Sequence, residues 1–216
     1  MKHLENFLGK IAGFLFRIVC IVMVYVGFRP KIIYADPARK KKGFDKPVVF
    51  TCNHLSHKDG LVIATVLWKY RVHILSAKDQ MEKSKLYFHV LSNNRAIPVN
   101  RFGLDTGWIK ECIRVMKEGN SVIIFPEGHT SKTGEMDKFR PGFALLATMA
   151  GSEVVPVAID GHYKFLFGRR LRVMIGEPET LRAAESGQRS SVHLQAEADR
   201  FREMTAELLE KANQTH

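Results

Sequence analysis

Short apolar runs alternate with helix-like patterns along most of the chain. The apolar runs predict strands over residues 48–52, 72–77, 95–99, 121–125, 154–159 and 171–175. The segments between them predict helices over residues 59–70, 79–91, 104–118 and 142–150. This alternation is typical of an α/β fold, a single domain with a mostly buried central sheet flanked by helices. A further helix over about 191–212 has a polar bias and is expected on the surface.

A long apolar run lies near the N-terminus, from Ile11 to Phe28, and its only charged residue is Arg17. Its length is close to the ~20 residues that a helix needs to cross a bilayer. An arginine costs about 2.5 to 3.5 kcal/mol at mid-membrane, whereas each Ile, Leu, Phe or Val returns about 0.3 to 0.6 kcal/mol. We therefore expect a membrane-associated helix that either spans the bilayer or lies in its interface. A signal peptide and a buried core helix are the competing interpretations.

Basic residues are concentrated after this run, at Arg29, Lys31, Arg39, Lys40, Lys41, Lys42 and Lys46. If the helix spans, this asymmetry places the following domain on the cytoplasmic side. The same cluster would attract anionic headgroups. The expected organisation is an N-terminal membrane helix with a basic linker over residues 1–46, followed by the α/β domain over residues 47–216.

Charge, motifs and cysteine spacing limit the classes of function that the protein could have. The 216 residues suffice for one domain, and a net charge of +11 favours an anionic partner. The chain contains neither a G-x-G-x-x-G nor a G-x-S-x-G motif, and residues 128–134 do not form a phosphate-binding loop pattern. Binding to nucleic acid would depend on basicity alone, so we expect none. The widely spaced Cys20, Cys52 and Cys112 suggest neither disulfides nor zinc, and fit a reducing compartment.

The segment from Asn53 to Asp59 follows the first strand of the domain and precedes an apolar helix. A strand-to-helix turn can bring His54 and Asp59 together, although within one helix they would point ~140° apart. The carboxylate would then accept the Nδ1 proton and leave Nε2 free to act as a base. Two other interpretations remain open. Asp59 has capping-box spacing from Ser56, and His54, His57 and Asp59 resemble part of a metal site, although not the H-E-x-x-H zinc pattern.

Three more segments accompany this loop: Arg95-Ala-Ile-Pro-Val-Asn-Arg101, Phe125-Pro-Glu-Gly-His-Thr-Ser131 and Val154-Val-Pro-Val157. The pattern His54-x-x-x-x-Asp59, followed at this distance by Phe-Pro-Glu-Gly, is a specific combination. With it, residues 47–176 resemble the glycerolipid acyltransferase family, of the lysophosphatidic acid acyltransferase (1-acyl-sn-glycerol-3-phosphate acyltransferase) type.

The resemblance implies roles for the matching residues. His54 would deprotonate the acceptor hydroxyl, Asp59 would orient His54, and the alkoxide would attack the thioester of acyl-CoA or acyl-carrier protein without a covalent enzyme intermediate. Arg101, Glu127 and Gly128 would help to bind the glycerophosphate acceptor, with Arg101 gripping phosphate in a bidentate manner. From the residues alone, Arg101 could instead form a surface salt bridge, and Glu127 could be a buried structural partner.

One departure from the family pattern concerns the acceptor. The family usually continues Phe-Pro-Glu-Gly with Thr-Arg-Ser, whereas this chain has His129, Thr130 and Ser131 and lacks that arginine. The missing charge could come from one of four other residues, namely His129, Lys132, Lys138 and Arg140. Another lysophospholipid or an unusual alcohol could therefore replace lysophosphatidic acid as acceptor.

The sequence thus predicts an enzyme that converts lysophosphatidic acid into phosphatidic acid at a membrane, with its catalytic domain on the cytoplasmic side. The expected partners are a phospholipid membrane, a lysophospholipid, and acyl-CoA or acyl-carrier protein; no metal and no other cofactor is expected. The first alternative is a metal-dependent hydrolase that uses His54, His57 and Asp59. The second is a non-catalytic, basic membrane-binding protein, which would tolerate His54→Ala.

Overall fold

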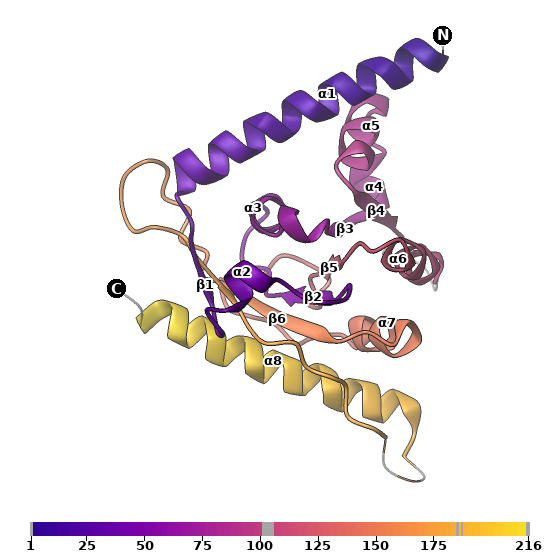
Figure 1. The fold of residues 1–216 in the computed structure, drawn as a ribbon, viewed down its shortest axis with the longest axis vertical. Helices are drawn as coiled ribbons and strands as arrows, with labels where there is room; N and C mark the ends of the chain where they lie inside the picture. The colour runs from indigo at the N-terminus through magenta and orange to yellow at the C-terminus, as the bar shows by residue number, and fades with distance from the viewer. Residues whose placement is uncertain (1, 101–105, 185, 187, 215–216) are drawn as a thin grey trace.

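A computed structural model describes residues 2–100, 106–184, 186 and 188–214 (Figure 1). In these residues the chain forms a seven-stranded sheet with the order β1-β7-β6-β2-β5-β3-β4. Neighbouring strands are parallel except β6 and β7, which are antiparallel. The strands are β1 (Lys31–Tyr34), β2 (Val49–Cys52), β3 (His73–Ala77), β4 (Ala96–Val99), β5 (Val122–Ile124), β6 (Val154–Ile159) and β7 (Arg172–Ile175). The carboxyl ends of β6, β2, β5, β3 and β4 therefore meet at one edge.

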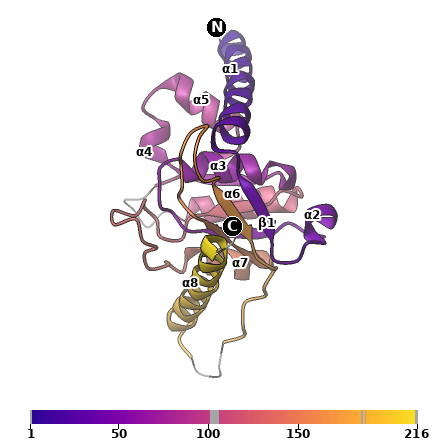
Figure 2. The same ribbon diagram turned by 90° about the vertical axis from the view of Figure 1, so that its left-hand side faces the viewer.

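Helices cover both faces of the sheet (Figures 1 and 2). The helix α3 and the N-terminal helix lie on one side, and α6, α7 and α8 lie on the other. The helices are α1 (Lys2–Val22), which continues as the π-helix η1 (Met23–Phe28), α2 (Arg39–Lys42), α3 (Asp59–Val66), the 3₁₀-helix η2 (Trp68–Tyr70), α4 (Lys78–Met81), α5 (Lys85–Asn93), α6 (Gly107–Lys117), α7 (Gly142–Ala150) and α8 (Ser190–Gln214).

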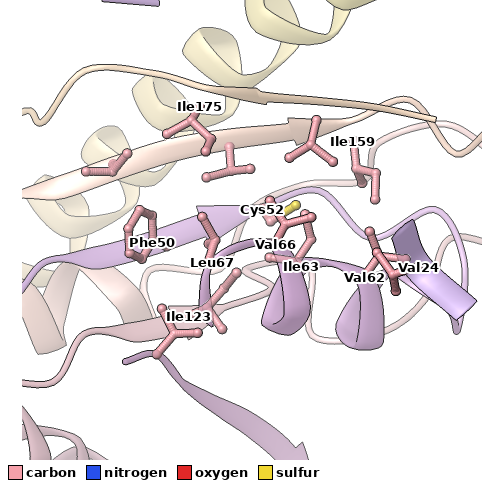
Figure 3. Packing of buried hydrophobic residues seen from close by; sticks show 14 of the residues in the cluster. Val24, Phe50, Cys52, Val62, Ile63, Val66, Leu67, Ile123, Ile159 and Ile175 are labelled. Carbon is pink, nitrogen blue, oxygen red and sulfur yellow. The ribbon is translucent and has the colours of Figure 1, made fainter. Parts of the chain in front are cut away.

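The core lies on both sides of the central strand β2. Phe50 and Cys52 belong to the same buried cluster as Val62 and Ile63 of α3 (Figure 3), whereas Val49 belongs to the cluster on the opposite face. All of these side chains are fully buried. Complete burial of an aliphatic or aromatic side chain contributes about 1.5–3 kcal/mol, so the strand that carries the site is held firmly from both sides.

The predicted α/β class is confirmed, and each predicted strand lies within one residue of an observed one at both ends. The predicted helix over residues 79–91 is wrong, because α4 and α5 are separate. Met81 and Val90 are both buried. Residues nine apart on one straight helix point about 180° apart, so both can reach the interior only if the helix is interrupted.

The strand β1 was not predicted. It lies within the expected basic linker and pairs in parallel with β7, from Lys31 beside Arg172 to Tyr34 beside Ile175. Its apolar run is short and is surrounded by basic residues, which masked the strand pattern. The linker therefore supplies an edge strand to the sheet.

The helix α1 packs along one side against α5 and α3. Gly9 and Gly13 allow the close approach, because a Cβ on Gly13 would lie 2.9 Å from the Cβ of Asn93. The opposite side exposes apolar residues, namely Phe7, Leu8, Ile11, Phe14, Leu15, Ile18, Val19, Ile21, Val22, Tyr25 and Val26. The continuous segment Phe7–Phe28 is long and apolar enough to cross a membrane, with a mean hydropathy of 2.3. At its end, Val24 and Phe28 enter the core of the domain.

Candidate active site

His54 and Asp59 lie at opposite ends of the turn that joins β2 to α3. The imidazole Nδ1 of His54 is 3.0 Å from Oδ2 of Asp59. The Asp59 side chain is fully buried, whereas 18% of the His54 side chain is exposed. Because a carboxylate can only accept a hydrogen bond, Nδ1 carries the proton and Nε2 presents its lone pair. The turn thus brings together the two residues that the sequence paired.

Asp59 is held by two further donors. The backbone N–H of Ser56 donates to Oδ2 at 2.7 Å, and the Tyr163 hydroxyl donates to Oδ1. The capping interpretation of Asp59 is therefore only partly correct, since its carboxylate closes the turn at Ser56 and also holds the imidazole. Burial, together with the negative charge of Asp59, raises the pKa of Tyr163, so its hydroxyl keeps the proton that it donates.

The imidazole ring is also fixed in orientation. Phe125, just after β5, stacks on His54 with 4.3 Å between ring centroids. The Thr130 hydroxyl oxygen lies 3.2 Å from His54 Nε2 and 3.2 Å from His57 Nδ1. In this position Thr130 donates to the Nε2 lone pair, which is the same contact that a reacting hydroxyl would make. Neither Thr130 nor Tyr163 was singled out from the sequence.

Glu127 is fully buried behind the catalytic turn. Its Oε1 accepts the backbone N–H of His54 at 2.6 Å, and its Oε2 accepts that of Asp137 at 3.0 Å. Burial raises the pKa of this carboxyl, and the two backbone hydrogen bonds oppose that rise. Glu127 therefore joins the His54 turn to the segment around Asp137, which corresponds to the structural alternative considered for it from the sequence.

The predicted acceptor residues within the described part of the chain lie around Glu127. A pocket of about 260 Å³ is lined by Glu127, His129, Asp137, Lys138, Phe139, Arg140 and Gln195. Gly128 has a φ of +76°, and the Arg140 guanidinium would lie 3.4 Å from a Cβ at that position. A side chain at residue 128 would thus be strained and would crowd Arg140. His129 Nε2 is 3.1 Å from Asp137 Oδ2.

Three of the four candidate replacements for the missing arginine line this pocket: His129, Lys138 and Arg140. The fourth, Lys132, is exposed and is not among the lining residues. Arg101, the expected phosphate ligand, lies outside the described residues. The pocket therefore provides positive charge beside the catalytic turn.

Asn53 ties the catalytic turn to the neighbouring strand. Its fully buried side chain donates to the Ile159 carbonyl at 3.0 Å and accepts the Ile159 N–H at 2.9 Å. Together with the bond from His54 N–H to Glu127, these contacts hold the turns after β2, β5 and β6 at the carboxyl edge of the sheet, where ligands bind in open α/β folds. Within the described part of the chain, no three His, Cys, Asp or Glu side chains are arranged to hold a metal ion.

Comparisons with known proteins are consistent with this geometry. A 1-acyl-sn-glycerol-3-phosphate acyltransferase of Bacillus subtilis is 31% identical over 137 residues, which cover 62% of this chain and 67% of the relative. One of Cocos nucifera is 34% identical over 128 residues, 58% of this chain and 41% of the relative. This chain thus spans about two thirds of the bacterial relative and less than half of the plant relative.

A solved structure has the same fold. The crystal structure of the 1-acyl-sn-glycerophosphate (LPA) acyltransferase PlsC from Thermotoga maritima aligns over 100% of both chains, with a TM-score of 0.60 and 16% sequence identity. The sequence profile described as Acyltransferase matches residues 31–160. That match spans more than half of the chain, from β1 through the end of β6, and therefore the protein belongs to the Acyltransferase family.

Proposed function

We propose that this enzyme transfers a fatty acyl group to the free hydroxyl of lysophosphatidic acid and thereby forms phosphatidic acid. The single observation that carries the proposal is the His54–Asp59 pair, with Nδ1 held at 3.0 Å and Nε2 directed at a hydroxyl. The names of the relatives support lysophosphatidic acid as the acceptor.

The reaction needs a base to deprotonate the acceptor hydroxyl and a thioester to donate the acyl group. His54 Nε2 takes the proton of the acceptor hydroxyl as the oxygen attacks the thioester carbon, and the C–S bond then breaks. The imidazolium returns the proton to the departing thiolate. Asp59 stabilises the imidazolium and keeps the tautomer correct. We expect the donor to be acyl-CoA or acyl-carrier protein, and no metal or additional cofactor takes part.

The pocket beside Glu127 is the proposed site for the acceptor phosphate. Lys138 and Arg140 are exposed at its edge, and guanidinium groups bind phosphate through paired N–H donors. His129 lies next to Thr130, whose hydroxyl contacts His54 Nε2. A phosphate in the pocket would thus direct the rest of the acceptor toward the base. Arg101 is proposed as an additional phosphate ligand.

We propose that α1 holds the enzyme at a phospholipid membrane by lying in the interface. Gly9 and Gly13 bring one side of α1 against α5, while the other side exposes a continuous apolar surface. One face of this helix is apolar and exposed, and the opposite face packs on its own domain. Such a helix is suited to lie in the membrane interface. The basic residues after η1 would be attracted to the anionic lipids of the cytoplasmic leaflet, which favours a position on the cytoplasmic side. There the lysophospholipid is concentrated and a soluble acyl donor has access.

Acyl transfer to a panel of acceptors tests the proposal. Purified enzyme in detergent micelles receives radiolabelled acyl-CoA or acyl-carrier protein together with lysophosphatidic acid, other lysophospholipids or glycerol-3-phosphate. We expect lysophosphatidic acid to be preferred, and Arg140→Gln to raise its KM more than it lowers kcat. Preference for another acceptor would contradict the assigned substrate, and transfer to no acceptor from either donor would contradict the reaction.

A further inference from the structure

A cluster of arginines surrounds Trp68, away from the catalytic turn. The Arg95 guanidinium lies 4.3 Å from the Trp68 ring centroid, and that of Arg17 lies 5.2 Å from it. The positive charges of Arg71 and Arg17 are close enough to lower the pKa of Arg95, although burial is the larger cause. Two guanidinium groups, one from α1 and one from the residue before β4, thus lie over one indole. Arg71, the residue directly after η2, adds a third positive charge close to Arg95.

The cluster lacks the negative charge that such a group normally attracts. Among the described residues, no carboxylate lies within ion-pair distance of these three guanidinium groups. The Nη1 atom of Arg95 is buried and has no hydrogen-bond partner within the described part of the chain. A buried guanidinium N–H without an acceptor is costly, and like charges at close range add to that cost. Its geometry is suited to an anion that the described residues do not supply.

The position of the cluster separates it from the active site. Asp59 begins α3, whereas Trp68 follows its last turn. His54 lies at the carboxyl ends of the parallel strands, and Arg95 immediately precedes β4 at the opposite edge. The residues thus belong neither to the catalytic turn nor to the pocket beside Glu127. They lie instead where α1 passes over the end of α3, because Arg17 of α1 reaches Trp68. Figure 1 shows α1 on the α3 side of the sheet.

We propose that Arg17, Arg71, Arg95 and Trp68 form a binding site for the phosphate of an anionic phospholipid headgroup. This inference rests on the proposed attachment of α1 to a membrane. An interfacial helix inserts its apolar face about 5–10 Å into the headgroup and acyl boundary, and a helix is about 10 Å across. The side of α1 that carries Arg17 would then lie at the level of the lipid phosphates. Arg71 is exposed and marks the entrance to the site.

The same placement explains why an arginine interrupts an apolar helix. The Arg17 guanidinium lies over Trp68 of the domain and at a similar distance over Phe14 of its own helix, so it sits beside the apolar side of α1 and also reaches the domain. An arginine in contact with a headgroup phosphate keeps a counterion, so its transfer to the membrane surface costs little. Guanidinium groups also match the oxygens of phosphate more closely than ammonium groups do.

Fluorescence of Trp68 provides a direct test. The chain contains two tryptophans, so Trp108→Phe leaves Trp68 as the only indole reporter. The full chain in neutral detergent is titrated with dihexanoyl phosphatidylglycerol, dihexanoyl phosphatidylcholine or inorganic phosphate. We expect a saturable change with the anionic lipid, and a change with the other two only at concentrations at least about tenfold higher.

Variants distinguish a specific binding site from a general attraction between the basic protein and the anionic lipid. Arg95→Gln and Arg71→Gln should each weaken the binding of the anionic lipid by at least about fivefold, which corresponds to one basic contact near a lipid surface. Lys117→Gln removes the same charge from an exposed position on α6 and should leave the affinity within about twofold. Because Arg71 is exposed, Arg71→Gln should fold and keep its melting temperature even if Arg95→Gln does not.

Three outcomes would overturn the proposal: no saturable change with any ligand, equal effects of Arg71→Gln and Lys117→Gln, or inorganic phosphate binding as tightly as the anionic lipid. The last would assign the site to a free phosphate compound. Acyl transfer in neutral micelles distinguishes this failure from failure of the proposed function, because Arg71→Gln should keep the wild-type rate there.

Discussion

At the residue scale, the catalytic geometry depends on how completely Asp59 is bound. Its two carboxylate oxygens accept from Ser56 N–H, from the Tyr163 hydroxyl and from the His54 imidazole, and the side chain is fully buried. A carboxylate with this many donors stays in one orientation. The imidazole, stacked on Phe125, is therefore positioned before any substrate arrives.

Asp59→Asn tests the role of the charge. The new amide can donate to His54 Nδ1, which would move the imidazole proton to Nε2 and remove the base. We expect kcat to fall by roughly 10³–10⁴-fold with little change in KM. Steady-state kinetics measure this, and circular dichroism checks the fold. A rate within tenfold of wild type would show that the carboxylate does not control the tautomer.

Tyr163→Phe removes only the hydroxyl that donates to Asp59. One buried carboxylate oxygen then loses its donor, which costs about 1–3 kcal/mol in stability. We expect kcat to fall by about tenfold because the carboxylate is less firmly oriented. Tyr70→Phe is the matched control, since it removes a hydroxyl that contacts Tyr34 away from the site. Equal kinetic effects of the two variants would contradict a role for Tyr163 in catalysis.

Without the family resemblance, the candidate site was predictable only where its residues are close in sequence. His54 and Asp59 are five residues apart, and the nearby strand and helix patterns indicate the turn between them. Tyr163 reaches Asp59 from 104 residues away, and Thr130 reaches His54 from 76 residues away. No periodicity encodes such contacts. They follow from the order of strands in the sheet, which brings the turns after β2, β5 and β6 together.

At the element scale, hydrophobic patterns predicted the buried strands and most helices. They failed where an element lies among charged residues or is interrupted. The edge strand β1 is as long as β2, but basic residues flank its short apolar run, so its sequence carries little strand pattern. The break between α4 and α5 depends on which side of each helix meets the interior, and that is decided by tertiary packing.

The contact between α1 and α5 is another tertiary feature, and Gly13→Leu tests it. A Cβ at residue 13 would lie 2.9 Å from Asn93 Cβ, so the larger side chain must push the helices apart. We expect faster cleavage between α1 and the domain in limited proteolysis. Leu15→Ala, on the exposed side of α1, is the control and should weaken membrane binding without changing cleavage. Identical cleavage of Gly13→Leu and wild type would mean that this packing is not needed.

At the scale of the whole molecule, helices on both faces of the sheet keep water from the core. Cys52 on β2 and Cys112 on α6 are fully buried in different clusters. Burial raises the pKa of Cys52 well above its usual range and that of Cys112 to about 12. At pH 8, only a fraction of about 10⁻⁴ of the Cys112 thiols is therefore ionised.

We therefore expect neither thiol to be alkylated by iodoacetamide at pH 8 in the native protein. Both should react once denaturant exposes them, because the unfolded pKa is near 8.5 and a larger fraction is then thiolate. Mass spectrometry of labelled peptides measures the difference. Native labelling of Cys52 as fast as in denaturant would mean that the cluster between β2 and α3 is open to solvent.

The central claim is that His54 is the base in acyl transfer to lysophosphatidic acid, and its neighbour His57 supplies a matched control. Both imidazoles contact Thr130, but only His54 is paired with Asp59. The decisive measurement is the kcat for phosphatidic acid formation by His54→Ala and His57→Ala, with wild type beside them. We predict a loss of about 10²–10⁴-fold for His54→Ala and less than about tenfold for His57→Ala. Equal losses, or an active His54→Ala, would contradict the assignment of the base.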